Sequence, residues 1–306
     1  MYERWVDCDG LWVHTVDWEP EPGAARPDQP PVVLVHGLGG STVSWELVGA
    51  SLAARLGARV TAVDLPGFGR TRCEDRPPSF RVHAQLLAAF LEARRAAVVV
   101  GNSMGGALGV ALAASRPELV HALVLVNAAL PRPRGNLEQL MRTMRFAALL
   151  APRAATPIVR ARARTLGPEG LVDSTLRFVL AHPEALDPQI RTHLVALATE
   201  RHQFPESATA YTQSGGSLFR YLAGPMRRDL AAVHRPTLVV HGRRDQLVPV
   251  GFARALAHQR GDWPLVELEG CGHVPQLEQP DRFVGTVCGW LERAGLSGAR
   301  GRAAPA

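Results

Sequence analysis

Lysine is missing from this 306-residue sequence, and all 34 residues counted as Lys+Arg are arginine. They outnumber the 28 acidic residues and give a formal net charge of +6. Arginine without lysine, in a chain rich in alanine, glycine and proline, is typical of codon bias in a GC-rich genome. We therefore interpret the surplus as a solvated basic surface and predict no nucleic-acid partner.

Cysteine is scarce, and its four positions lie far apart without a Cys-x-x-Cys pair, which argues against a zinc site or a redox motif. These cysteines are Cys8, Cys73, Cys271 and Cys288. No nucleotide-binding loop or flavin motif is visible, so we expect no metal and no cofactor. Residues 1–10 place Glu3, Arg4 and Asp7 where a secretion signal needs an apolar stretch, which together with reduced thiols favours the cytoplasm.

Formal charge is absent from residues 96–115, a stretch as long as a membrane-spanning helix. Its middle, however, reads Gly101-Asn102-Ser103-Met104-Gly105-Gly106. Three glycines and two polar side chains make a poor lipid-facing surface, but they suit a sharp turn between a buried strand and a buried helix. We predict this turn rather than a membrane span.

Short, unbroken apolar runs rich in β-branched residues recur along the chain and predict strands covered on both faces. They occupy residues 32–35, 60–63, 97–100, 123–126 and 238–240, with a weaker run at 265–268. A hairpin with strands at 3–7 and 12–18, turning at Asp9-Gly10, precedes them. Helical patterns at 45–56, 80–95, 104–115 and 283–291 alternate with the runs. This alternation predicts an α/β fold with a mostly parallel, doubly wound sheet.

The alternation stops after Asn127 and resumes at Thr237. The residues between are helical in pattern and are interrupted by prolines, Pro157 and Pro168 among them. We predict a core formed by residues 1–130 and 231–306, with residues 131–230 inserted as a helical cap. Such a cap would lie over the carboxyl edge of the sheet, where ligands bind in open α/β folds.

The turn after the run at 97–100 has the pattern of a nucleophile elbow, Gly-x-Ser-x-Gly between a strand and a helix. Such a turn leaves Ser103 exposed at the mouth of the sheet, and glycine at positions 101 and 105 avoids collisions with the neighbouring strand and helix. A serine hydroxyl needs a base to take its proton as it attacks. We therefore predict that Ser103 is a nucleophile with a histidine nearby.

Among the eleven histidines, only His273 lies in a loop after the final strand, where it can turn back over the carboxyl edge. A carboxylate must fix the tautomer of this imidazole. Asp245 follows the penultimate strand and precedes His273 by 28 residues. The other position for the acid, after the strand at 123–126, offers only Asn127, so Asp245 is the predicted third member.

Acyl transfer also requires N–H donors for the developing oxyanion. We expect the backbone of Met104 to provide one donor and the loop His36-Gly37-Leu38-Gly39-Gly40 to provide the other, from Leu38.

Taken together, these motifs resemble the α/β-hydrolase-fold serine hydrolases, in particular capped esterases and lipases and the hydrolases of meta-cleavage products. The resemblance rests on His36-Gly37, Asp64-Leu65-Pro66-Gly67-Phe68-Gly69, the elbow, Gly242 to Asp245 and Gly272-His273. It implies substrate contacts by Gly37, Asn102, Phe68 and Val274. Relatives that dehalogenate alkanes or open epoxides carry an aspartate nucleophile, so Ser103 disfavours those reactions. Carbon–carbon bond hydrolases typically carry a Ser-Asn pair in the oxyanion loop, which Thr42-Val43-Ser44-Trp45 does not reproduce.

The resulting prediction is a hydrolase for the carboxylic ester of a small to medium apolar molecule. Three rivals stay open: a carbon–carbon bond hydrolase, a cofactor-free perhydrolase, and a ligand receptor built on a silenced hydrolase. Residues 131–165 also carry eight arginines against the single acid Glu138, interleaved with apolar residues from Leu140 to Leu150. This pattern indicates either a solvated cap helix or a weak contact with an anionic lipid surface.

Overall fold

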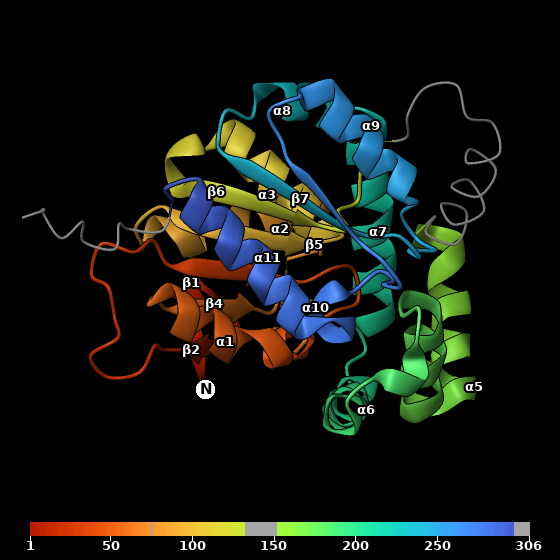
Figure 1. Cartoon of the computed structure of the whole chain (residues 1–306). Coiled ribbons are helices and arrows are strands. Elements are labelled where there is room, and N and C mark those ends of the chain that lie inside the picture. The colour runs from red at the N-terminus through yellow and green to blue at the C-terminus, as the bar shows by residue number, and fades with distance from the viewer. Residues whose placement is uncertain (75, 132–151, 297–306) are drawn as a thin grey trace, which may run out of the picture.

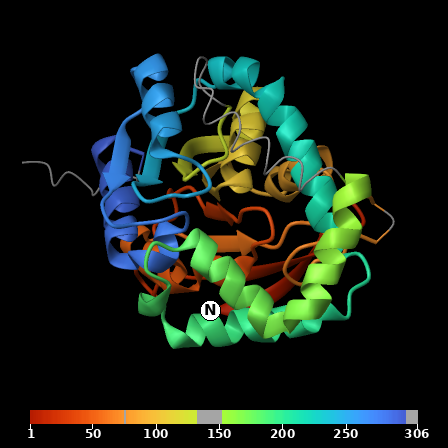
Figure 2. The same ribbon diagram turned by 90° about the vertical axis from the view of Figure 1, so that its right-hand side faces the viewer.

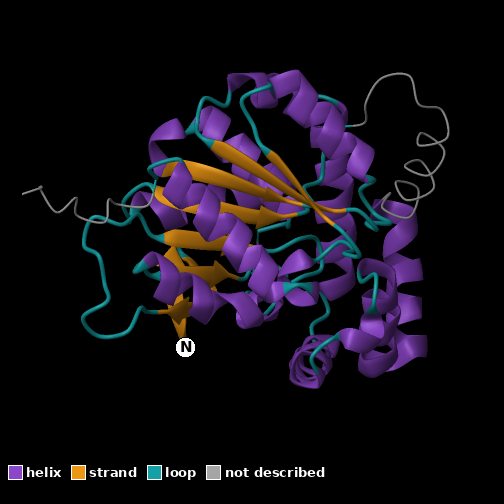
Figure 3. Cartoon of the chain, viewed as in Figure 1, coloured by secondary structure: helices purple, strands orange, loops and turns teal. Residues whose placement is uncertain are grey.

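The computed structural model describes residues 1–74, 76–131 and 152–296, and within them an eight-stranded sheet forms the centre of the molecule (Figures 1 and 3). The strands are β1 (Tyr2–Cys8), β2 (Leu11–Trp18), β3 (Val32–Val35), β4 (Val60–Val63), β5 (Ala97–Asn102), β6 (Val120–Val126), β7 (Thr237–Gly242) and β8 (Leu265–Leu268). Their order is β1-β2-β4-β3-β5-β6-β7-β8, with β2 antiparallel to both of its neighbours and every pair from β4 to β8 parallel. The predicted fold class is confirmed.

Helices pack on both faces of this sheet, because alternate residues of the buried strands point to opposite sides. On one side lie α2 (Phe80–Glu92), α3 (Met104–Ser115) and α9 (Val250–Arg260), and on the other α1 (Glu46–Leu56) and α11 (Pro280–Arg293). The short elements η1 (Thr42–Trp45), η2 (Pro117–Leu119) and α10 (Pro275–Glu278) join them. Two separate apolar clusters result, one on each face of the sheet.

Local chemistry explains the turn between β1 and β2 and the position of α2. Asp9 and Gly10 have φ values of 59° and 79°, the left-handed conformation that a tight hairpin turn requires. Ser79 caps α2 by accepting a hydrogen bond from Val82 N at 3.3 Å. This helix ends at Glu92, three residues earlier than predicted. The Arg94 guanidinium instead folds back to lie 3.7 Å from the centroid of the Phe90 ring.

Between β6 and β7 the described residues form the helices α5 (Pro152–Val179), α6 (Pro188–His202), α7 (Ser207–Ala223) and α8 (Met226–Ala232), with η3 (Pro183–Ala185) between α5 and α6. We call α5 and α6 the outer helices; Figures 1 and 2 show them beyond the carboxyl ends of the parallel strands. By contrast, α7 contacts α2 and α8 contacts α3. The division into a core and a 131–230 cap stays a prediction.

One predicted break in this region was wrong. Pro157 lies inside α5, near its beginning, where its missing N–H costs a single backbone hydrogen bond. The helix is interrupted instead at Gly167, whose φ of 63° and ψ of 177° are not helical, directly before Pro168. A residue that precedes proline is disfavoured in the helical region, and glycine adopts the alternative easily.

The arginine-rich stretch is described only in its second half. Arg160, Arg162 and Arg164 are exposed on α5. Outside the described residues lie Arg132, Arg134, Arg142 and Arg145, with Glu138 and the apolar positions from Leu140 to Leu150; the side chain of Arg153 is not described either. Among the helices of residues 1–74, 76–131 and 152–296, none is both long and apolar enough to cross a membrane.

Candidate active site

Ser103 lies between β5 and α3 in a strained turn. Its φ of 54° and ψ of −114° are unusual for a residue with a side chain, and its backbone N donates to Val126 O of the adjacent strand at 3.0 Å. The residue is partly exposed, although both elements around it are buried. This geometry is that of a nucleophile elbow, which points a hydroxyl outward from the edge of a sheet.

Glycines flank Ser103 because backbones approach closely on both sides. A Cβ on Gly101 would lie 2.3 Å from Gly105 O, and a Cβ on Gly105 would lie 2.2 Å from Val35 O. Real side chains never tolerate such distances. The two glycines are therefore required for the turn to bring Ser103 to the ends of β3 and β5.

His273 and Asp245 meet at the same edge of the sheet. His273 Nδ1 donates to Asp245 Oδ2 at 2.7 Å, while Asp245 Oδ1 accepts from the backbone N of Leu247 at 2.8 Å and of Val248 at 3.0 Å. Both side chains are buried. The carboxylate is held on both oxygens, and the proton on Nδ1 leaves His273 Nε2 free to act as a base.

The charge of Asp245 is favoured by its neighbours. Burial alone would raise its pKa, but His273, nearby His241 and the hydrogen bond from Asn127 outweigh burial and hold the pKa below its usual range. A carboxylate at this position stabilises an imidazolium at His273, which is the species that forms when a serine loses its proton to the base.

Asn127 is the functional candidate that sequence reasoning missed. Its Nδ2 donates to Asp245 Oδ2 at 2.7 Å and to Gly272 O at 3.0 Å, and its Oδ1 accepts from Gly242 N at 3.2 Å. The side chain thus fixes the acid and both loops that carry the acid and the base. The sequence signal for it is its position directly after the strand that ends at Val126, where only a carboxylate was expected.

Asn102 connects the elbow to the loop of His273. Its Nδ2 donates to His273 O at 3.0 Å and to Val126 O at 3.1 Å, so both of its amide protons are engaged. The residue is also 4% exposed. Asn102 thus holds the loop of His273 beside the elbow through the backbone. Its contact with a substrate stays a prediction.

The described hydrogen bonds do not include a direct one between Ser103 Oγ and His273 Nε2. Such bonds are often long before a substrate binds and shorten in the reacting complex. The structure links the two residues through Asn102, which directly precedes Ser103 and donates to the backbone of His273. It also places the Asp245 carboxylate against the imidazole of His273.

The predicted oxyanion loop lies directly against Ser103. A Cβ on Gly37 would lie 3.0 Å from Ser103 Cβ. Within the described part of the chain, neither the Leu38 N–H nor the Met104 N–H donates a hydrogen bond. Two unused donors on the two segments that meet at a serine are what an oxyanion hole requires.

Buried polar side chains fix this loop from below. His36 accepts from Leu65 N on Nε2 at 3.0 Å and donates from Nδ1 to Gly37 O at 2.7 Å. Complete burial lowers its pKa, so the ring is neutral, as this pattern of one acceptor and one donor requires. Asp64 Oδ1 accepts from Thr42 N at 2.7 Å. Asp64 thus supports the residues that follow the loop.

Phe68 and Val274, the two remaining predicted substrate contacts, lie in different surroundings. Phe68 is 2% exposed and packs with its ring centroid 5.9 Å from that of His36 and 5.8 Å from that of His83. Phe68 therefore packs in the core below the loop of His36, and its contact with a substrate stays a prediction. Val274 is 9% exposed and packs with Leu176 and Leu180 of the outer-helix region, directly after His273. Its contact with a substrate stays a prediction.

Metal binding has no candidate among residues 1–74, 76–131 and 152–296, which contain no group of three or more His, Cys, Asp or Glu side chains suited to hold an ion. The four cysteines are buried and unpaired.

Comparison with known proteins decides the family. The model of the alpha/beta hydrolase family matches residues 32–286. This chain belongs to the alpha/beta hydrolase family. The match spans both the elbow and the loop of His273, so this hydrolase carries its candidate site within the family's common core.

Individual relatives point to hydrolysis without agreeing on a substrate. The hydrolase is 29% identical over 95% of its length to a 2-hydroxy-6-oxo-6-(2'-aminophenyl)hexa-2,4-dienoic acid hydrolase of Metapseudomonas resinovorans, of which it covers 91%. It is also 29% identical over 83% of its length to a pimeloyl-(acyl-carrier protein) methyl ester esterase of Nitrosomonas europaea, of which it covers 93%.

A solved structure with a similar fold is that of a bacterial membrane phospholipase A. The TM-score is 0.74 at 25% sequence identity, covering 97% of this chain and 87% of the other. These proteins share the fold and a hydrolytic activity, while the bonds named for them differ.

Proposed function

We propose that this hydrolase cleaves carboxylic esters of small to medium apolar molecules through Ser103, His273 and Asp245. The observation that carries the proposal is the 2.7 Å hydrogen bond between His273 and Asp245 at the edge of the sheet where the strained turn presents Ser103. Asn102 supports it by linking the two parts.

The reaction follows from these positions. Ser103 Oγ attacks the ester carbonyl carbon, and its proton passes to His273 Nε2 while Asp245 stabilises the imidazolium. The carbonyl oxygen becomes negative and accepts hydrogen bonds from the Leu38 and Met104 amides. The C–O bond to the alcohol then breaks, and His273 gives the alcohol its proton. Water repeats the sequence on the acyl-Ser103 and releases the acid.

A second candidate is cleavage of a carbon–carbon bond. It is favoured by the relative from Metapseudomonas resinovorans, which is named for a dienoic acid and aligns with 95% of this chain. The same three side chains would serve that reaction, so geometry at Ser103 does not separate the two. The methyl ester esterase from Nitrosomonas europaea, equally similar in identity, supports the ester.

The test is a panel of p-nitrophenyl esters with acyl chains from two to sixteen carbons, run beside a thioester, a lactone and a dienoic ring-cleavage product. We expect the highest kcat/KM on an ester and a loss of about 10⁴-fold or more in the Ser103→Ala variant. Dienoic turnover above ester turnover would replace the proposal by its second candidate. Full activity of Ser103→Ala, with no labelling of the wild type by a fluorophosphonate, would refute both.

Two further expectations belong to this proposal. We infer a cytoplasmic site of action from the unpaired, buried cysteines, and a weak contact of the arginine-rich segment with anionic lipid. Arg160, Arg162 and Arg164, exposed on α5, support the second inference.

A further inference from the structure

The carboxyl end of α5 is hydrogen-bonded to the loop that carries His273. The side chain of Glu278, on α10, accepts from Gly272 N on Oε1 and from Ala181 N on Oε2, each at 2.8 Å. Gly272 directly precedes the base, and Ala181 lies two residues beyond α5. One carboxylate therefore bridges the His273 loop and the outer helices; we call this contact the Glu278 bridge.

A second hydrogen bond runs beside the bridge without any side chain. His273 N donates to Val179 O, the last residue of α5, at 2.7 Å. A Cβ on Gly272 would lie 2.7 Å from both Val179 O and Ala181 N. The two backbones are therefore in direct contact, so a displacement of the end of α5 must displace the backbone of His273 as well.

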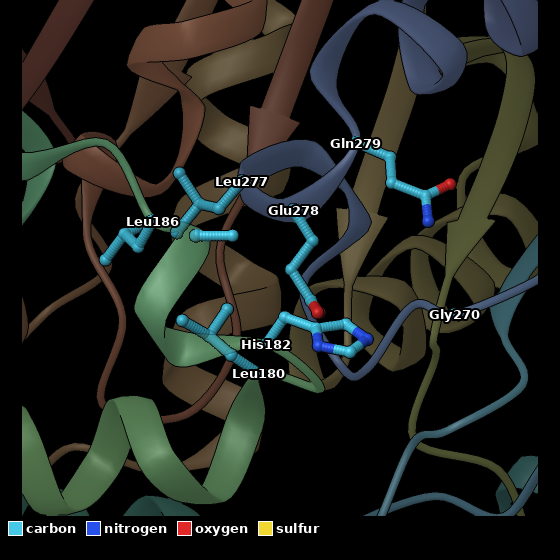
Figure 4. Close-up of a pocket in the computed structure, with 8 residues that line it drawn as sticks. Leu180, His182, Leu186, Gly270, Leu277, Glu278 and Gln279 are labelled. Carbon is cyan, nitrogen blue, oxygen red and sulfur yellow. The ribbon is translucent and has the colours of Figure 1, made fainter.

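The surroundings of Glu278 leave the bridge room to shift. A pocket of about 130 Å³ lies next to it, lined by Leu180, Leu186 and Leu277 with His182, Glu278 and Gln279 (Figure 4). Figure 4 shows the Glu278 side chain reaching from α10 toward His182 and Leu180. On the side of this pocket, neighbouring side chains do not pack tightly against the Glu278 carboxylate.

We propose that Glu278 is a positioning residue that makes the placement of the His273 imidazole depend on the placement of α5. The inference rests on the proposed function, because it assigns His273 the role of the base. Its consequence is that a ligand which moves the outer helices also adjusts the base relative to Ser103. Glu278 itself touches no reacting atom.

The chemistry of the bridge needs a carboxylate. Burial raises the pKa of Glu278, and hydrogen bonds from backbone N–H groups oppose that shift by favouring the charged form. The side chain of glutamine has the same shape, but it has one acceptor oxygen and one NH₂ group. Glu278→Gln therefore keeps one arm of the bridge and turns the other into a contact between two donors.

The experiment compares Glu278→Gln with the wild type and with the control Arg72→Gln. Arg72 contacts Glu206, at the beginning of α7, and so joins the same inserted region to the core away from His273. Active sites are counted by a fluorophosphonate, and kcat and KM are measured for the best ester. We expect Glu278→Gln to lower kcat per active site by about 10- to 100-fold with KM changed less than about threefold, and Arg72→Gln to leave both unchanged.

A second readout needs no turnover. Amide hydrogen exchange of His273 and Ala181 should be faster in Glu278→Gln than in the wild type by at least about tenfold and unchanged in Arg72→Gln. Wild-type kcat per active site together with wild-type exchange in Glu278→Gln would overturn the inference. Failure of Ser103→Ala to lose activity would refute the proposed function alone, since exchange still reports on the bridge.

Discussion

The Asn127 side-chain amide donates to Asp245 Oδ2 at 2.7 Å, to the same oxygen that accepts from His273. Asp245 follows β7, and Asn127, its neutral hydrogen-bond partner, follows the neighbouring strand β6. Two adjacent strands cooperate in placing one carboxylate, which Asn127 can do because amides donate and do not compete for protons.

Two substitutions of Asn127 should distinguish the loss of its hydrogen bond to Asp245 from the effect of a second carboxyl group at the same place. Its φ of 43° is left-handed, so Asn127→Gly removes the amide without backbone strain. We expect kcat to fall about tenfold, in line with the loss of one hydrogen bond to a charged group. Asn127→Asp should cost more, because two carboxyls in contact cannot both stay ionised. Steady-state kinetics at neutral pH test the order, and an Asp variant as active as wild type would contradict it.

Asp245→Asn should preserve the packing around His273 but remove the acceptor that fixes its tautomer. We expect kcat to fall by about 10⁴-fold with little change in the thermal midpoint of unfolding. Fluorophosphonate labelling of Ser103 should slow by a similar factor. A loss below tenfold would mean that Asp245 is only a structural partner of His273.

A matched pair of glycines tests the elbow. In Gly105→Ala the new Cβ would lie 2.2 Å from Val35 O, and we expect at least about 3 kcal/mol of destabilisation or an insoluble product. Gly251, in α9, has no atom within 4 Å of its Cβ position, so Gly251→Ala should stabilise the fold by about 0.4–1 kcal/mol. Urea unfolding measures both, and equal midpoints for the two variants would refute the proposed close approach.

The stability of this hydrolase should fall in acid because of His83. Burial, with a smaller contribution from His36, lowers the pKa of His83 to about 3, while its Nε2 contacts Ser214 Oγ at 2.8 Å. The unfolded chain therefore takes up a proton near pH 6.5 that the folded chain refuses until about pH 3. Stability is fully retained above the unfolded pKa and declines below it, by roughly 2–3 kcal/mol at about pH 4.5.

His83→Gln is the control for this acid sensitivity, since its amide can still contact Ser214 but does not titrate. The free energy of unfolding in urea, measured near pH 7 and pH 4.5, should decline less in this variant. Some decline should persist, because burial also lowers the pKa of His36 and of His241. The same decline in the variant and the wild type would rule out His83 as a source.

Most of the sheet could be predicted from the sequence, because each buried strand is a short β-branched run with a turn at its end. The run at 32–35 and the helix at 104–115 were found with their observed bounds. Helix ends were less accurate, since they depend on contacts such as that of Arg94 with Phe90. The break at Gly167 lies directly before Pro168, where an interruption was predicted, whereas the interruption predicted at Pro157 was wrong.

The sequence likewise identified some residues of the candidate site but not the contacts between them. Ser103, Asp245 and His273 were identifiable because each follows a predicted strand, and parallel strands bring their carboxyl ends to one edge. The hydrogen bond from Asn102 to His273 O and the burial of Phe68 could not be predicted in this way, because both depend on segments distant in the sequence.

The sequence by itself determined the strand and helix periodicity, the family and the residue types that can perform the chemistry, since all of these depend on local patterns. Only the tertiary structure decided which polar side chains hold others in place. Asn127 meets Asp245 across 118 residues, and Glu278 meets Ala181 across 97. No local pattern encodes such contacts, because they arise only when strands and helices distant in sequence pack against one another.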